Sequence, residues 1–141
     1  MQCIKKHALY LAWAVSLAAM FGSLYFSNVR GFPPCVLCWY QRIFMYPLVF
    51  ILGIAILKKD AKVYRYALPL AVIGWLIAAY HNLLYWKIIP DSLAPCVTGV
   101  SCTTKYIEWF GFVTIPFLSF LAFTAVILLM YRYKKNFYEN K

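Results

Sequence analysis

The sequence has few charged residues and, among them, very few acids. Only 13% of its 141 residues are Asp, Glu, Lys or Arg, and just four of these are acidic. Soluble domains carry about 25% charged residues, so this shortage excludes a water-soluble globule. The 65% hydrophobic and 20% aromatic content likewise excludes a disordered chain and indicates an integral membrane protein.

The 14 basic residues gather at the ends of apolar stretches, and they give the chain a net charge of +10. In a soluble protein this charge would suggest nucleic acid. Here the basic residues suit anionic lipid headgroups at the edges of membrane spans. We therefore expect membrane lipid, and no nucleic acid, among the partners.

Four stretches lack Asp, Glu, Lys and Arg altogether: residues 8–29, 43–57, 66–86 and 109–131. The second is too short to cross a hydrocarbon core of about 30 Å unless its helix begins upstream, near Cys38. The sequence thus predicts an all-α membrane protein, a single domain over residues 1–141 that forms a bundle of four transmembrane helices. The expected spans are about 8–28, 38–57, 66–86 and 109–131, with loops at 29–37 and 87–108.

Basic residues are distributed unevenly between the two sides of this predicted bundle. Ten of the 14 lie in the N-terminus, the connection between the second and third spans, and the C-terminal tail. Cytoplasmic segments carry such an excess of Lys and Arg. We therefore expect a multi-pass protein of the plasma membrane with both termini in the cytoplasm and the loops 29–37 and 87–108 on the extracytoplasmic face.

Cysteines are concentrated in or beside these two loops. Four of the five fall there, as Cys35, Cys38, Cys96 and Cys102. Disulfides form on the oxidising side of a membrane, and the orientation was assigned without the cysteines. A Cys-x-x-Cys spacing at this face indicates redox chemistry, and Trp39 stands where haem attachment would need His.

The first cysteine pair follows Pro33 and Pro34, which favour a helix start because no amide donor is needed there. Unpaired amides and the helix dipole stabilise a thiolate at such a terminus. Arg42 lies one helical turn after Cys38, on the same face. The sequence therefore predicts that Cys38 is the thiolate with a lowered pKa.

The second pair, Cys96 and Cys102, closes a short ring around Gly99, which permits a tight reversal of the chain. We expect a local disulfide that is exposed and exchanges with a partner protein. A static structural disulfide is the alternative for this pair.

Polar residues inside the predicted spans are the remaining candidates. His81 and Asn82 lie near the outward end of the third span, at about the depth of Arg42 on the second. Ionisable groups within a membrane are candidates for function. Beside a thiolate, and beneath Trp39 and Tyr40, they would suit a flat, carbonyl-bearing acceptor such as a quinone. The alternatives are an interfacial histidine at His81 and a snorkelling side chain at Arg42.

Residues 35–42, Cys-Val-Leu-Cys-Trp-Tyr-Gln-Arg, resemble the signature of the DsbB family of membrane thiol-disulfide oxidoreductases. The four spans, the Cys-x5-Cys of the second loop and residues 109–116 resemble the short BdbC type of Gram-positive bacteria. This resemblance implies an enzyme that reoxidises an extracytoplasmic thioredoxin-like thiol oxidase of the DsbA or BdbD type. Electrons would pass to membrane quinone, with menaquinone expected, and so support disulfide formation in secreted proteins.

The resemblance also implies a role for each of the four cysteines. Cys96 takes the mixed disulfide with the partner, and Cys102 then attacks the disulfide between Cys35 and Cys38. The attack falls on Cys35, which leaves Cys38 as the thiolate that faces the quinone.

The same resemblance makes Arg42 the residue that holds the quinone oxygen, with His81 as a further quinone-site candidate. Gln41 stands where some relatives carry an acid. A hydrogen bond between helices is the other role expected for Gln41, because polar side chains within spans commonly make one.

Two other classes of protein could use the same thiols. One is a metal-binding membrane protein without redox turnover, in which the four cysteines form a zinc site. The other is a small scaffold stapled by two structural disulfides. The oxidising compartment favours disulfides over thiolate ligands, so we expect no resident metal.

Overall fold

The computed structural model describes residues 2–96, 100–103 and 114–139, and the secondary structure of this part is helical. The four long helices are α1 (Gln2–Leu24), α2 (Val36–Lys58), α3 (Tyr64–Tyr85) and α4 (Ile115–Glu139). A π-helical turn, η1 (Tyr25–Val29), continues α1, and a 3₁₀ turn, η2 (Asp91–Leu93), lies in the second loop. The predicted all-helical fold class is therefore confirmed.

The starts of α2 and α4 follow from local sequence. Cys35 is the N-cap of α2, in an extended conformation, and its Sγ accepts from the Cys38 backbone amide. Thr114 has the corresponding position before α4, where its Oγ1 lies 3.4 Å from the Phe117 amide. Pro116 falls in the first turn of α4, where a missing amide donor costs nothing.

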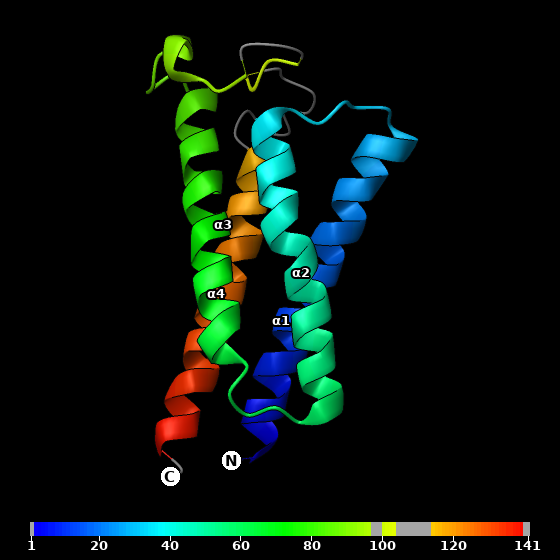
Figure 1. Cartoon of the computed structure of the whole chain (residues 1–141), viewed down its shortest axis with the longest axis vertical. Coiled ribbons are helices and arrows are strands. Elements are labelled where there is room, and N and C mark those ends of the chain that lie inside the picture. Colours follow the sequence, from blue (N-terminus) through cyan, green and yellow to red (C-terminus); the bar gives the residue numbers. More distant parts are fainter. Residues whose placement is uncertain (1, 97–99, 104–113, 140–141) are drawn as a thin grey trace.

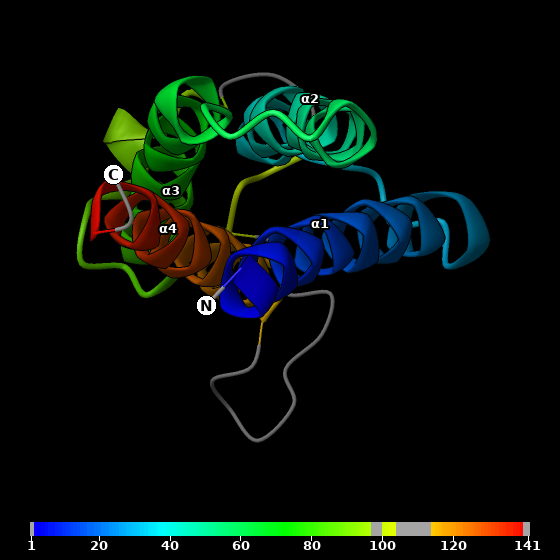
Figure 2. The same ribbon diagram turned by 90° about the horizontal axis from the view of Figure 1, so that it is seen from below.

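The four helices form a ring in which each packs against two neighbours, in the order α1, α2, α3, α4 and back to α1 (Figure 2). Both termini and the connection between α2 and α3 lie at one end of the bundle, which we call the terminal end (Figure 1). Segments 30–35 and 86–96 lie at the opposite end, which we call the loop end.

All four helices are long and apolar enough to cross a membrane, with mean hydropathies of 1.6 to 1.9 over the best windows. Large apolar side chains also face outward along them, as a hydrocarbon environment requires: Leu11, Phe21, Phe50, Leu57, Leu76 and Leu128. The chain is therefore a multi-pass membrane protein by the length and composition of its helices. Which end faces the cytoplasm stays a prediction.

The helix bounds differ from the expected spans at four places. The first helix begins at Gln2 rather than at residue 8, and the fourth continues to Glu139 rather than ending at residue 131. The second helix begins at Val36, slightly before the expected Cys38. The fourth was expected to begin at residue 109, but residues 104–113 lie outside the described part and Thr114 is not helical. A stretch free of charge marks apolar sequence, whereas the helix start is set by the capping threonine.

The buried core lies between the helices on the terminal side of the cysteines. Phe123, Leu48, Leu52 and Met130 are among its fully buried side chains. Phe123 of α4 packs directly against the backbone of Gly74 on α3, where a Cβ would overlap the aromatic ring. This close contact packs α4 against α3, the helix that carries His81 and Asn82.

Candidate functional site

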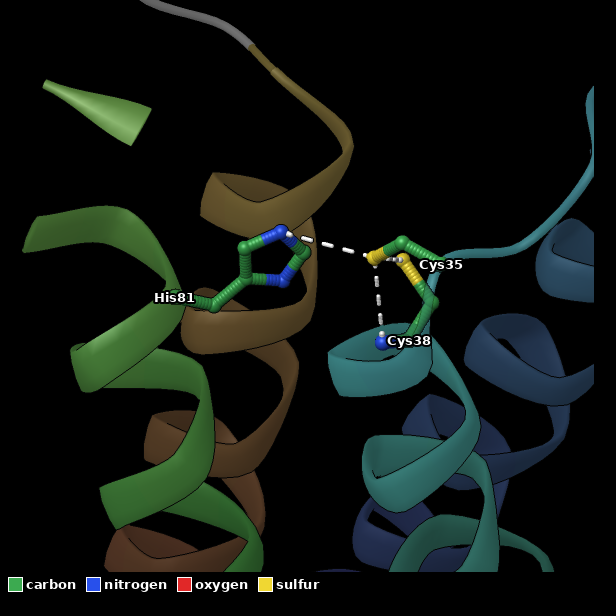
Figure 3. A group of neighbouring side chains, drawn as sticks. All are labelled: Cys35, Cys38 and His81. Atoms are coloured by element: carbon green, nitrogen blue, oxygen red, sulfur yellow. Dashed lines mark hydrogen bonds between the residues drawn. The ribbon is translucent and has the colours of Figure 1, made fainter. Parts of the chain in front are cut away.

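The first cysteine pair lies at the start of α2, with its two sulfur atoms facing one another (Figure 3). Cys35 and Cys38 are both in the thiol form, and their Sγ atoms lie 3.0 Å apart. Cys35 is buried, with 6% of its surface exposed, whereas Cys38 is partly exposed. This separation lets the pair close to a disulfide with little backbone movement.

The second pair forms a disulfide between Cys96 and Cys102, whose Cα atoms lie 6.0 Å apart. The predicted local disulfide is therefore present, although Gly99 lies outside the described residues. The expectation that this disulfide is exposed is wrong, because Cys102 is buried, with 3% of its surface exposed, and Cys96 is half-buried. The sulfur atoms of Cys35, Cys96 and Cys102 all lie within 4.8 Å of one another. The Cys35 sulfur is thus close both to that of Cys38 and to the two sulfurs of the second pair.

His81 reaches this group from α3 (Figure 3). Its Nε2 lies 3.8 Å from Cys35 Sγ and 3.1 Å from the Cys102 carbonyl oxygen. Its Nδ1 lies 3.0 Å from Gln41 Nε2, and only 1% of the residue is exposed. With the Gln41 amide donating to Nδ1, the proton of a neutral imidazole lies on Nε2, where it points to sulfur and carbonyl.

Hydrogen bonding at the pair favours a thiolate on Cys35 rather than on Cys38. The Cys38 thiol and then His81, the second donor, lower the pKa of Cys35 from 9.0 to about 4, against burial, which raises it. The prediction that Cys38 is the thiolate with the lowered pKa is therefore wrong in this structure. The prediction failed because the His81 imidazole and the Cys38 backbone amide contact the sulfur of Cys35, the N-cap residue, and not that of Cys38 in the first turn.

Arg42 lies beside the pair but is held by other groups. Its guanidinium donates to the Ser23 carbonyl oxygen of α1 at 3.0 Å and stands 5.5 Å above the Trp39 ring. These contacts fix the cation at the junction of α1 and α2. The snorkelling alternative is not favoured, because the guanidinium is bound by Ser23 and Trp39 and the side chain lines a cavity.

Asn82, which the sequence places beside His81, has a structural role. Its Nδ2 donates to the Ala78 carbonyl at 2.8 Å and to the Pro116 carbonyl of α4 at 3.0 Å. These bonds tie α3 to the first turn of α4. Gln41 meets the expectation of a hydrogen bond between helices, since it joins α2 to His81 of α3.

A cavity of about 410 Å³ opens beside the cysteines and extends between α1, α2 and α4. Its polar end includes Cys38, Arg42 and His81. Its walls are formed by small and apolar side chains that sequence reasoning did not single out: Val15, Ala18, Ala19, Gly22, Met45, Leu118 and Ala122. Small residues recurring on the first and last spans were the available signal, but small residues also serve plain helix packing.

Thiol and imidazole groups are also close enough to hold a metal ion. Cys35, Cys38 and His81 place one ligand atom each within 4.8 Å of the others. The sulfur atoms of Cys96 and Cys102 lie equally close to that of Cys35, but in their disulfide they offer no thiolate. The donor groups found among the described residues therefore include a histidine that the alternative of a four-cysteine zinc site lacked.

Comparison with known proteins gives a consistent result over nearly the whole chain. Residues 5–132 match the family model described as disulfide bond formation protein DsbB. The chain is 54% identical over 122 residues to disulfide bond formation protein C of Bacillus subtilis (strain 168), covering 86% of this chain and 88% of that protein.

Two further relatives extend the match. Probable disulfide formation protein C 1 of Bacillus anthracis is 50% identical over 133 residues, covering 94% of this chain and 95% of its own. Probable disulfide formation protein C of Halalkalibacterium halodurans is 50% identical over 117 residues, covering 83% and 85%. No solved structure matches the chain.

Proposed function

The chain belongs to the DsbB family of disulfide bond formation proteins, and from this premise we propose that it is a quinone-dependent thiol-disulfide oxidoreductase of the plasma membrane. It reoxidises an extracytoplasmic thioredoxin-like thiol oxidase, of the DsbA or BdbD type, and passes the electrons to membrane quinone. The loop end of the bundle faces the outside, where the partner is. The excess of basic residues in the N-terminus, the α2–α3 connection and the tail supports this orientation.

The observation that carries the proposal is that the Cys35 sulfur lies close to its own partner and to both sulfurs of the second pair. This sulfur lies 3.0 Å from that of Cys38 and within 4.8 Å of those of Cys96 and Cys102. Thiol-disulfide exchange needs direct attack of one sulfur on another, so adjacent pairs can pass a disulfide between them. A scaffold with two static disulfides would not need this proximity.

The exchange begins with the first pair in its disulfide form. A thiolate of the reduced partner attacks Cys96, and Cys102 leaves as a thiolate. The second partner thiol then attacks the mixed disulfide, so that the partner leaves oxidised and Cys96 becomes a thiol. Two electrons and two protons have now entered the second pair.

Cys102 next attacks the first disulfide at Cys35, and Cys38 leaves as a thiolate. Cys96 attacks Cys102 in turn, which restores the second disulfide and releases Cys35. The lowered pKa of Cys35 makes it a good leaving group in this last step. The first pair is then a dithiol, and its return to the disulfide requires an acceptor for two electrons.

The cavity beside Cys38 fits a quinone headgroup, because a cation lies at its polar end and apolar side chains form its walls. A bound quinone, which we expect to be menaquinone, would supply the two-electron acceptor. In this proposal Arg42 holds a quinone oxygen and Cys38 is the thiol that faces the ring. His81, hydrogen-bonded on both nitrogens, orients the Cys35 sulfur.

Anaerobic stopped-flow absorbance tests the proposal. Purified protein supplied with menaquinone is mixed with a reduced thioredoxin-like dithiol, and wild type is compared with Cys38→Ser. We expect quinone reduction by wild type and its loss in Cys38→Ser, whereas Cys3→Ser, at the far end of α1, should match wild type. Unchanged quinone reduction by Cys38→Ser would contradict the assignment of this thiol.

A further inference from the structure

We propose that the reduced chain binds one zinc ion through Cys35, Cys38 and His81. The inference rests on the proposed function in one respect, namely that turnover produces the Cys35–Cys38 dithiol. The ion is an inhibitory ligand that competes with disulfide formation, and it is no part of the reaction itself. All three ligand atoms come from the described residues and lie within 4.8 Å of one another.

The spacing of these atoms is close to that of a tetrahedral zinc site. Zinc lies near 2.3 Å from thiolate sulfur and 2.0 Å from imidazole nitrogen, so neighbouring ligand atoms are about 3.5–3.8 Å apart. Cys35 Sγ and His81 Nε2 lie 3.8 Å apart, and the two sulfur atoms lie 3.0 Å apart. Side-chain rotation that separates the sulfur atoms by under one ångström completes the geometry.

Gln41 supports the imidazole as an outer partner. A histidine that binds zinc through Nε2 carries its proton on Nδ1 and donates it to an acceptor, which fixes the ring. The Gln41 amide lies 3.0 Å from Nδ1, and half a turn of this amide presents its oxygen in place of its nitrogen. The Gln41 side chain can therefore form a hydrogen bond with His81 Nδ1 whether or not Nε2 binds a metal ion.

The charges of the ligands also suit a buried ion. Two thiolates neutralise a divalent cation, so the closed site carries no net charge where Cys35 and His81 are 6% and 1% exposed. Thiolate and imidazole ligands select zinc over magnesium or calcium, which take oxygen ligands. The fourth position belongs to water or, when the second pair is reduced, to Cys96 or Cys102, whose sulfurs adjoin Cys35.

Zinc and the first disulfide exclude each other, because a sulfur in a disulfide is no thiolate ligand. Binding releases protons from the thiols, forms two Zn–S bonds and one Zn–N bond, and moves no electrons. A bound ion thus holds the dithiol reduced and prevents its oxidation. Zinc at the loop end would stop turnover after the partner has delivered its electrons, and a chelator would restore it.

Cobalt substitution tests the site without quinone or partner protein. Reduced protein, purified anaerobically with a phosphine reductant, is titrated with Co²⁺ alone and then with Zn²⁺. We expect one Co²⁺ per chain, with the visible bands of tetrahedral cobalt and a sulfur-to-cobalt band, all removed by Zn²⁺. Protein with the first pair oxidised should show none of these bands.

Matched variants identify the ligands. Cys38→Ser should abolish the sulfur-to-cobalt band or halve it, and His81→Ala should weaken binding at least about tenfold, since even outer partners contribute that much. The controls His7→Ala and Cys3→Ser change the other histidine and the remaining cysteine, at the terminal end, and should match wild type. His81→Cys keeps a ligand in place and should strengthen the sulfur-to-cobalt band even where His81→Ala fails to fold.

Wild-type affinity in both His81→Ala and His81→Cys, with an unchanged spectrum, would overturn the assignment of the histidine. Absence of stoichiometric cobalt from reduced wild type, or equal binding to oxidised protein, would overturn the whole site. Neither result touches quinone reduction, which is measured separately without metal. Loss of quinone reduction with intact cobalt binding would instead overturn the proposed function and leave the metal site standing.

Discussion

Cys35 lies between two kinds of chemical neighbour, the Cys38 sulfur at 3.0 Å and the His81 Nε2 at 3.8 Å. Its place as the N-cap of α2 adds the Cys38 backbone amide as a third donor. Each of these groups stabilises negative charge on the Cys35 sulfur, which is the sulfur of the first pair that lies close to the second pair. In the proposed exchange, Cys35 is therefore both the sulfur that Cys102 attacks and the thiolate that leaves in the last step.

The ionisation of Cys35 gives a pH dependence that can be measured. We expect the thiolate absorbance of Cys35 in the reduced protein to persist as the pH falls and to disappear at about pH 4, because hydrogen bonds from Cys38 and His81 lower the pKa of Cys35. Ultraviolet titration of reduced protein measures it, with Cys35→Ser as the control that lacks the transition. A wild-type titration without a transition near pH 4 would contradict the geometry.

The same lowered pKa affects the stability of the reduced protein. The unfolded thiol, with its pKa near 9.0, takes up a proton first as the pH falls, while the folded thiolate remains ionised. The contribution to folding is therefore complete above about pH 9 and declines steadily towards pH 4. The oxidised protein lacks this dependence because its sulfur does not titrate.

Arg42 is expected to act on quinone affinity rather than on turnover. Arg42→Ala should raise the apparent KM for quinone by roughly tenfold or more, the value of a charge-assisted hydrogen bond, with a smaller effect on kcat. Steady-state quinone reduction over a range of quinone concentrations measures both. Arg30→Ala, which removes a cation stacked on Phe32 at the loop end, is the matched control and should leave KM unchanged. An unchanged KM in Arg42→Ala would refute the assignment.

At the scale of helices, the contact between α3 and α4 depends on a glycine, Gly74, which leaves room for the Phe123 ring. Gly74→Ala would place a Cβ into the Phe123 ring, so the helices must separate or the ring must move. We expect a loss of about 1–3 kcal/mol in the free energy of unfolding, as for other overpacked cores. Thermal unfolding of the purified protein in detergent measures the loss.

Gly22→Ala is the matched control for this packing prediction. Among the described residues nothing lies within 4 Å of the Cβ position at Gly22, and alanine favours a helix over glycine by about 1 kcal/mol. The control should therefore be neutral or stabilising. Equal destabilisation by both substitutions would show that the contact with Phe123 is not the cause.

Local sequence was enough to predict most of the helices and the two cysteine pairs. Runs without charge indicate four apolar helices, and Pro33, Pro34 and the Cys-x-x-Cys spacing indicate a helix start with reactive thiols. The start of the fourth helix was missed because apolar character does not mark it. Thr114 followed by a proline in the first turn was the signal that could have placed it.

Contacts between helices could not be predicted in the same way. Spacing along α2 places Arg42 on the same helix face as Cys38. It does not predict that the guanidinium donates a hydrogen bond to the Ser23 carbonyl oxygen of α1. The bond between Gln41 and His81 depends on the register of α2 against α3. The wrong choice of Cys38 as the low-pKa thiolate came from this gap, because the deciding donor comes from another helix.

At the scale of the whole molecule, the two ends of the bundle differ in chemistry. Both termini and the basic α2–α3 connection lie at the terminal end (Figure 1), whereas the two cysteine pairs and His81 lie at the loop end. An even number of membrane crossings requires that both termini face the same compartment. The excess of positive charge indicates that this compartment is the cytoplasm.

Reporter fusions test this orientation. A fluorescent protein that matures only in the cytoplasm should be active at either terminus, whereas alkaline phosphatase should be active only when inserted in the second loop, after Asp91. The bundle stays intact in all three fusions, because each site lies outside the long helices. Active phosphatase at the C-terminus would reverse the proposed orientation and place the cysteines on the cytoplasmic side.

The position of all the redox groups at one end of the bundle has an energetic consequence for the cell. Moving one elementary charge across a membrane under 100 mV involves about 2.3 kcal/mol. In the proposed reaction, electrons from the cysteines enter the cavity beside Cys38, and the protons that accompany them leave thiols at the same end of the bundle. If no charge crosses the bilayer in this reaction, the transfer from the cysteines to quinone neither consumes nor builds the membrane potential.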